Sequence, residues 1–386
     1  MIQFLLAIIY LSFISLGLPD GLLGAAWPTM CVEMGVPVSY AGFISVTIAG
    51  GTILSSLLSD RLTFRFGTGR ITAVSVAMTA LALIGFSVTK SYWALFIWAI
   101  PYGLGAGSVD ASLNNYVALH YASRHMSWLH CMWGMGASVG PYIMGYALTA
   151  GQGWEMGYRY VGFIQVAVAA ILLFWIPIWK KRKTDTSEET SVSDAPLGLR
   201  EILGIPGARE VMIAFFCYCA LEGVAMLWGS TYLVGKLGMA EERAASLASL
   251  FFIGITSGRF ISGFLTYKLS DESMIRMGQM IIGAGIAVML LPSGELAATL
   301  GLLLIGLGCA PIYPCIIHST PAHFGAEKSQ ALIGVQMASA YLGTLLMPPV
   351  FGILANHISV SLMPFYMGLI LTVMIVMCEK LNRKCA

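Results

Sequence analysis

The chain is built from long apolar runs, each about as long as a helix that crosses a bilayer. A membrane-spanning helix needs about 20 predominantly apolar residues, and such runs recur from one end of the sequence to the other. They are continuous rather than alternating every second residue, so they predict helices and not the strands of a membrane barrel. The predicted spans are 3–28, 40–60, 70–89, 92–118, 127–150, 158–179, 209–234, 244–268, 274–292, 295–318, 329–354 and 360–379.

Charged residues are too scarce for a water-soluble protein of this length. Lys, Arg, Asp and Glu make up 10% of the 386 residues and hydrophobic residues 58%, whereas soluble globular proteins carry about 25% charged residues. So little charge could not cover the surface of a soluble fold. The composition also excludes a disordered chain, a collagen-like repeat and a disulfide scaffold. We therefore expect an all-α membrane protein with twelve transmembrane helices.

Enzyme and metal chemistry have no support in the sequence. It contains no GxSxG, HExxH or Walker A motif. The eight cysteines lack the spacing of a zinc site, and a net charge of +2 indicates no nucleic-acid surface. The protein is therefore expected to need no cofactor, no metal and no nucleic-acid partner, and not to be an enzyme.

The placement of Lys and Arg predicts how the chain lies in the membrane. With a cytoplasmic N-terminus, 16 of the 21 Lys and Arg residues fall in inner loops, 4 in outer loops, and Arg259 within a span, as the positive-inside rule requires. The first basic residue is Arg61, so the basic region of a cleavable signal peptide is missing. We expect a multi-pass protein of the plasma (inner) membrane with both termini in the cytoplasm.

One charged segment, rich in Ser and Thr, divides the chain in two. Residues 180–208 cannot bury apolar area, so they predict a mobile cytoplasmic linker. The linker separates residues 1–179 from residues 209–386, and each of these parts contains six predicted spans.

The two halves are similar in sequence at a nearly constant offset. The matched positions are 202 or 203 residues apart and include Gly51 and Gly254, Gly103 and Gly306, Gly140 and Gly343, and Asp20 and Glu222. Chance similarity between helices rich in Gly and Leu is the alternative explanation. Parallel repeats of six spans are typical of transporters that expose a midplane site alternately to each side of the membrane.

With this repeat, the chain resembles the major facilitator superfamily over its whole length. The connection after the second span carries Asp60–Arg61 and Gly69–Arg70, which is similar to the superfamily's cytoplasmic signature, with Ser56 in place of its leading Gly. The resemblance implies two pseudo-symmetric six-helix bundles, a monomer, and a conformational loop in which Asp60, Arg61 and Arg70 latch the halves together. Ordinary positive-inside charge is the alternative role of these three residues.

Four charged residues lie well inside predicted spans: Asp20, Asp110, Glu222 and Arg259. Each costs about 2.5–3.5 kcal/mol at the centre of a span. Burial favours the protonated form of a carboxylate, so the three acids are candidates for proton coupling. Arg259 is the candidate charge partner for an acid, and a purely structural ion pair is the alternative.

The sequence around two of these acids favours a functional site. Pro19 and Gly21 flank Asp20 and allow the helix to bend beside its carboxylate. Asp110 and Asn114 are four residues apart, so they share one face of a helix. Asn114 is therefore a candidate for hydrogen bonding to a solute, and a contact between helices is the alternative.

These elements are similar to those of the fucose–galactose–glucose/proton symporter family. In that family an Asp in the first span and an acid followed by Asn in the fourth occupy the positions of Asp20, Asp110 and Asn114. The resemblance implies that the first acid acts in proton coupling and the second in sugar recognition. His130 and Trp133 stand where the family has polar amides in the fifth span, and this difference leaves the solute open.

A sugar site needs an aromatic face and polar groups that bind hydroxyls. The candidates are Asn114, His130, Trp133, Trp228, Tyr313 and Gln336. Core packing is the alternative role for the aromatic residues and for Gln336. We therefore predict a secondary transporter that performs proton-coupled symport of a sugar or similar small polar solute. One alternative is proton-driven efflux of amphipathic compounds or drugs. Another is coupling to Na⁺ instead of protons, and a third is a receptor or scaffold that transports nothing.

Overall fold

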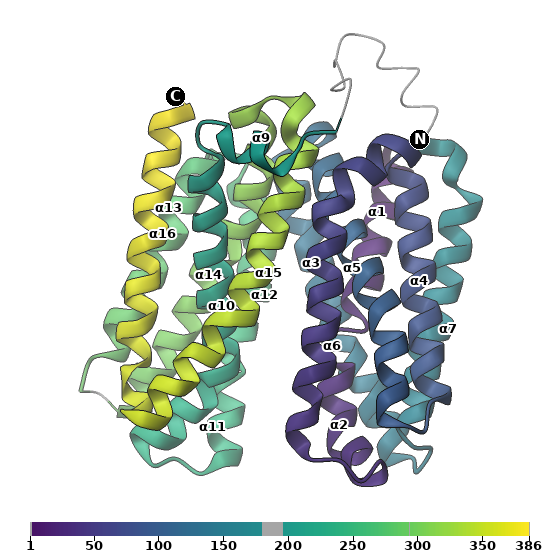
Figure 1. Cartoon of the computed structure of the whole chain (residues 1–386). Helices are drawn as coiled ribbons and strands as arrows, with labels where there is room; N and C mark the ends of the chain where they lie inside the picture. The colour runs from purple at the N-terminus through teal and green to yellow at the C-terminus, as the bar shows by residue number, and fades with distance from the viewer. Residues whose placement is uncertain (1, 180–195, 293, 386) are drawn as a thin grey trace. The chain divides into compact units, whose positions relative to one another are not determined.

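The computed structural model describes residues 2–179, 196–292 and 294–385, and every regular element within them is a helix (Figure 1). The first half contains α1 (Ile2–Gly17), α2 (Leu22–Glu33), η1 (Val38–Tyr40), α3 (Ala41–Phe66), α4 (Thr68–Val88), α5 (Tyr92–His120), α6 (Ser123–Thr149) and α7 (Trp154–Phe174). The second half contains α9 (Leu199–Gly204), α10 (Ala208–Leu237), α11 (Glu241–Ala248), α12 (Leu250–Leu265), α13 (Asp271–Met289), α14 (Gly294–Phe324), α15 (Ala326–His357), η2 (Val360–Leu362) and α16 (Met363–Cys385).

These helices confirm the predicted membrane architecture. Among the residues that the structure describes, nine helical segments are long and apolar enough to cross a membrane. The helices α5, α6 and α13 complete the twelve, and their polar and charged residues lower their hydropathy. The protein is thus an all-α membrane protein with twelve spans.

Several helix boundaries differ from the prediction, among them those of the first, second and eighth predicted spans. The first span is two helices, α1 and α2, interrupted at residues 18–21. The second span continues as α3 to Phe66, because no helix-breaking residue precedes Gly67, which has a φ of 80°. The span predicted over 244–268 consists of α11 and α12, which meet at Ser249.

The chain divides into two compact units. Unit 1 comprises the described residues within 1–116, 129–196 and 326–334, and unit 2 comprises those within 117–128, 197–325 and 335–386. Of the segment predicted to be a linker, residues 180–195 lie outside the described residues. The short helix α9 occupies part of the remainder.

Asp20 lies in the break between α1 and α2. Pro19 has no N–H group and cannot continue the hydrogen bonding of α1. Gly21 has a φ of 82°, a left-handed conformation that glycine adopts without the steric penalty of a Cβ atom. The sequence predicted a bend at this point, and the structure shows a complete interruption of the helix.

The internal repeat is visible in the helix packing of each unit. In unit 1, Gly103 of α5 lies against the backbone carbonyl of Ile48 in α3, and in unit 2, Gly306 of α14 lies against that of Phe251 in α12. Gly103 and Gly306 are 203 positions apart, and so are Ile48 and Phe251. A Cβ atom at either glycine would overlap the carbonyl, so the same close helix contact is built twice. This packing confirms the two pseudo-symmetric bundles.

A neighbouring glycine contact provides a test of the packing in unit 1. Gly140 of α6 lies against the backbone carbonyl of Leu18, whereas a Cβ atom at Gly145 on the same helix would meet no described atom within 4 Å. We expect Gly140→Ala to lower the free energy of unfolding by about 1–3 kcal/mol, because the added methyl group overlaps backbone rather than a movable side chain. The matched control Gly145→Ala should preserve or slightly raise stability, since Ala favours a helix over Gly. Equal melting temperatures for the two purified variants would contradict this packing.

Candidate functional site

Two neutral hydrogen-bond donors hold the carboxylate of Asp20. Trp133 Nε1 of α6 donates to Oδ2 at 2.9 Å, and the Tyr102 hydroxyl of α5 donates to Oδ1 at 3.3 Å. Within the described residues, no Lys, Arg or His nitrogen forms an ion pair with this carboxylate. Asp20 can therefore gain and lose a proton without the separation of an ion pair.

The neighbouring helices fix the geometry of the Asp20 site. Gly17 at the end of α1 lies against the backbone carbonyl of Trp133, so α1 and α6 approach closely enough for the indole to reach the carboxylate. Pro19 and Tyr102 line a cavity of about 30 Å³ together with apolar side chains of unit 1. This volume accommodates one or two water molecules but no sugar.

A second polar cluster in unit 1 links α5 to α6. Asn114 Nδ2 donates to Asp110 Oδ1 at 2.7 Å, and Asn114 Oδ1 lies 3.1 Å from His130 Nε2. Because an amide oxygen only accepts hydrogen bonds, the His130 nitrogen that faces it carries a proton. All three side chains are buried, Asn114 completely, and the ring of Phe13 stands edge-on to His130 at 5.4 Å. In this conformation the Asn114 amide is thus engaged by the protein itself.

Unit 2 carries Glu222 at the position equivalent to Asp20, but with a positively charged neighbour. Arg259 Nη2 of α12 lies 3.4 Å from Glu222 Oε1 of α10, with the two side chains 4% and 14% exposed. Once buried, such a pair is costly to separate, since each ion would be left without its partner. The two acids related by the repeat therefore differ in their partners, since Glu222 forms an ion pair and Asp20 accepts from neutral donors.

The other predicted binding residues of unit 2 contact different parts of that unit. Trp228 Nε1 donates to the carbonyl of Pro348 at 2.9 Å, and the Tyr313 hydroxyl donates to a methionine sulfur at 3.1 Å. Gln336 is fully buried and shares hydrogen bonds of 3.1 Å with Thr320. These contacts contribute to packing in the conformation described.

The predicted conformational loop is largely helical. Asp60 and Arg61 lie near the end of α3, and Arg70 lies in the first turn of α4. Gly67 alone connects the two helices, because α3 continues past the predicted end of the span. The residues predicted to latch the halves therefore lie at the end of α3 and the start of α4, and not in a flexible loop.

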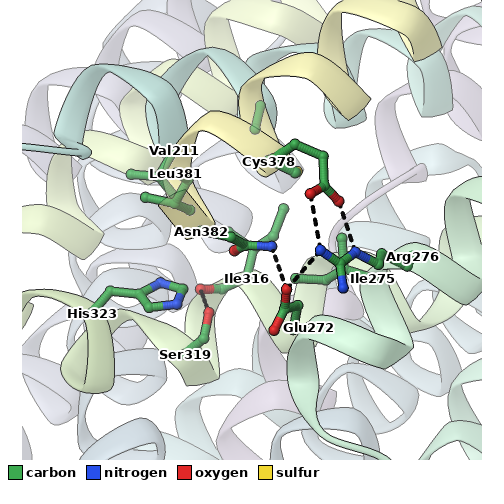
Figure 2. Close-up of a pocket in the computed structure, with 12 residues that line it drawn as sticks. Val211, Glu272, Ile275, Arg276, Ile316, Ser319, His323, Cys378, Leu381 and Asn382 are labelled. Carbon is green, nitrogen blue, oxygen red and sulfur yellow. Dashed lines mark hydrogen bonds and ion pairs between the residues drawn. The ribbon is translucent and has the colours of Figure 1, made fainter. Parts of the chain in front are cut away.

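The pocket in Figure 2 contains none of the predicted site residues. It lies in unit 2, where Arg276 of α13 donates to both carboxylate oxygens of Glu379 in α16 at 2.7 and 2.9 Å (Figure 2). Glu272 lies 2.9 Å from Arg276 and accepts a hydrogen bond of 2.9 Å from Asn382. The cavity measures about 20 Å³, enough for one water molecule. These ion pairs link helices, and the space beside them does not suit a solute.

No candidate metal centre emerges from the part of the chain that the structure describes. Its His, Cys, Asp and Glu side chains form no group of three or more that could hold a metal ion.

Two side chains near Asp20 were not predicted from the sequence. Tyr102 donates to the carboxylate itself, and Gln165 of α7 accepts a hydrogen bond from Ser15 Oγ of α1 at 2.6 Å. A polar amide inside an apolar run is a signal that a partner must exist. Its partner could not be identified, because Gln165 and Ser15 are 150 residues apart in the chain.

Both halves of the sequence match one known family. The Major Facilitator Superfamily matches residues 9–327 and 211–382. A cis,cis-muconate transport protein of Acinetobacter baylyi is 23% identical over 352 residues, which cover 87% of this chain and 83% of the relative. Like the solved structures that share the fold, this relative is a transporter and not an enzyme.

Two solved structures show the same fold over nearly the whole chain. The major facilitator superfamily transporter FucP in the outward conformation has a TM-score of 0.79 and 14% identity, with 97% of each chain covered. The proton:xylose symporter XylE bound to 6-bromo-6-deoxy-D-glucose has a TM-score of 0.79 and 12% identity, with 99% of this chain and 95% of that chain covered.

Proposed function

Because the chain belongs to the major facilitator superfamily, and is thus a membrane transporter of small solutes, we propose that it performs proton-coupled symport of a sugar or similar small polar solute. Transport proceeds by alternating access, in which the binding site opens first to one side of the membrane and then to the other. Proton coupling requires a group that gains a proton on one side and loses it on the other.

The observation that carries this proposal is the environment of Asp20. Its carboxylate lies in a helix break inside a predicted span and accepts hydrogen bonds from Trp133 and Tyr102, which are both neutral. Because both donors are neutral and no Lys, Arg or His nitrogen of the described residues forms an ion pair with Asp20, proton uptake by the carboxylate separates no ion pair. We assign the coupled proton to Asp20, with Asp110 and Glu222 as the other acids that take part.

Support for a sugar comes from the aromatic and polar side chains of the predicted site and from the related structures. XylE is a proton:xylose symporter, whereas the muconate transport protein indicates that a small organic acid is the main competing solute. We assign contact with the solute, in the conformations that expose it, to Asn114, His130, Trp133, Trp228, Tyr313 and Gln336.

The remaining features of the proposal concern placement in the cell. The bias of Lys and Arg toward one set of loops supports cytoplasmic termini and an inner-membrane location. We further propose a monomer, in which residues 1–179 and 209–386 are the two moving bundles, residues 180–208 connect them, and Asp60, Arg61 and Arg70 act in the conformational change.

The test is solute uptake into proteoliposomes with an imposed pH gradient. We expect at least one of labelled L-fucose, D-xylose and D-glucose to accumulate against its gradient, and a protonophore should abolish the accumulation. A Na⁺ gradient at uniform pH is the control and should drive none. If cis,cis-muconate accumulates and none of the sugars does, proton coupling stands and the proposed solute changes from a sugar to a small organic acid. Dye or drug efflux without accumulation of any sugar or acid would instead establish the exporter.

A further inference from the structure

The helix break beside Asp20 leaves the backbone carbonyl of Ser15 without its usual donor. In an α-helix the carbonyl of residue i accepts from the N–H of residue i+4, so the donor for Ser15 would be the nitrogen of Pro19. A proline nitrogen carries no hydrogen. A buried carbonyl without a donor is costly, so another hydrogen-bonding group must take the place of the missing N–H.

A side chain from another helix replaces this donor. Gln165 Nε2 of α7 donates to the Ser15 carbonyl oxygen, and Ser15 Oγ donates back to Gln165 Oε1 at 2.6 Å. Both side chains are 1% exposed. The pair is reciprocal, so a hydrocarbon side chain of similar size would leave both the carbonyl and the hydroxyl of Ser15 unsatisfied.

From this geometry we propose that Gln165 is a positioning residue, which supplies the hydrogen bond that Pro19 removes and thereby holds the break in the orientation that Asp20 requires. The inference rests on the proposed role of Asp20 in proton coupling. The break is fixed from a second side as well, because Gly17 lies against the backbone of Trp133, whose indole donates to Asp20. Gln165 acts on the end of α1 before the break, and Trp133 acts on the carboxylate itself.

This role predicts that the effect of replacing Gln165 depends on whether residue 19 is proline. A role in general helix packing predicts no such dependence. Replacement of Pro19 by alanine supplies an N–H at the position from which the Ser15 carbonyl normally accepts. Gln165→Leu should therefore be harmful when Pro19 is present and much less harmful in the Pro19→Ala variant. Two changes in one hydrogen-bonding unit are then expected to be non-additive.

The experiment is a double-mutant cycle with Gln165→Leu, Pro19→Ala and the combined variant, measured by melting temperature in detergent and by uptake into proteoliposomes. We expect Gln165→Leu to reduce pH-driven accumulation about tenfold and to lower the melting temperature, and solute exchange without a gradient to be much less affected. In the Pro19→Ala background, the same substitution should lower the melting temperature by less than half as much. Ser12→Ala is the matched control, because the Ser12 hydroxyl donates at 2.9 Å to the Ile8 carbonyl of its own helix and, among the described residues, to no other helix.

Equal losses of melting temperature in the two backgrounds would overturn the inference. The same holds if neither Gln165→Leu nor the combined variant folds, because Gln165 would then serve packing whatever the donor. Folding of the combined variant alone supports the inference. The melting temperatures do not depend on transport. A failure of the proposed symport, seen as no pH-driven accumulation by the unsubstituted protein, or of the proposed role of Asp20, seen as unchanged accumulation in Asp20→Asn, is therefore distinguishable from a failure of the Gln165–Pro19 relation.

Discussion

Asp20→Asn is expected to abolish accumulation of the solute against its gradient while solute exchange across the membrane continues. Asparagine has nearly the same shape. Its amide oxygen can still accept from the Trp133 indole, and its NH2 group can donate to the Tyr102 hydroxyl in place of the bond that the carboxylate accepted, but it cannot carry a proton. The measurement is uptake into proteoliposomes with and without a pH gradient, with counterflow as the assay of exchange. The final internal solute concentration should equal the external one at every pH.

Asp110→Asn is the matched variant for this test, because Asp110, like Asp20, lies well inside a predicted span of unit 1. Asp110 is 5% exposed and accepts a hydrogen bond from Asn114, so its replacement should mainly alter solute affinity and exchange. If Asp110→Asn loses accumulation and Asp20→Asn keeps it in full, the coupled proton must be assigned to Asp110 instead of Asp20.

Arg259→Met is expected to be the most destabilising single substitution of a charged residue in unit 2. It leaves Glu222 buried without the cation that lies 3.4 Å away, and loss of one partner of a buried ion pair costs about 3–5 kcal/mol. The combined variant Arg259→Met with Glu222→Gln should recover most of this loss, since no buried charge remains. Melting temperature and the monodisperse fraction after purification measure the effect.

Arg276→Met provides the control at an exposed ion pair. The side chains of Arg276 and Glu379 are 48% and 37% exposed, and exposed pairs contribute about 0–1 kcal/mol. Similar melting temperatures for Arg259→Met and Arg276→Met would contradict the prediction, because they would show that buried Glu222 does not need the Arg259 cation for the stability of the fold.

The twelve spans could be predicted from the sequence because a membrane-crossing helix is a local property. Twenty apolar residues satisfy every backbone group within the helix itself, so the length and polarity of a run are sufficient to identify it. The break at Pro19 and Gly21 was indicated only as a bend. Whether a helix bends or stops there depends on the contacts of the flanking backbone, such as that between the Ser15 carbonyl and Gln165, which lie far away in the sequence.

The site could be predicted only where its residues are close in sequence. The spacing of Asp110 and Asn114 places them on one face, and they are hydrogen-bonded in the structure. No spacing rule connects Asp20 to Tyr102, because that contact depends on how α5 packs against the break. Trp133 and Gln336 are 203 positions apart and thus equivalent in the repeat. Their partners nevertheless differ, since Gln336 bonds to Thr320.

Under the proposed proton coupling, the unequal partners of Asp20 and Glu222 also predict how the membrane voltage acts on the transport cycle. The Glu222–Arg259 pair carries no net charge, whereas deprotonated Asp20 adds one negative charge inside a predicted span. A carrier loaded with a proton and a neutral sugar is then electrically silent at Asp20, and the empty carrier is charged. Each elementary charge that crosses the full field gains or loses about 2.3 kcal/mol per 100 mV. A negative interior would therefore accelerate the return of the empty carrier from the inside to the outside and leave the loaded step almost unaffected.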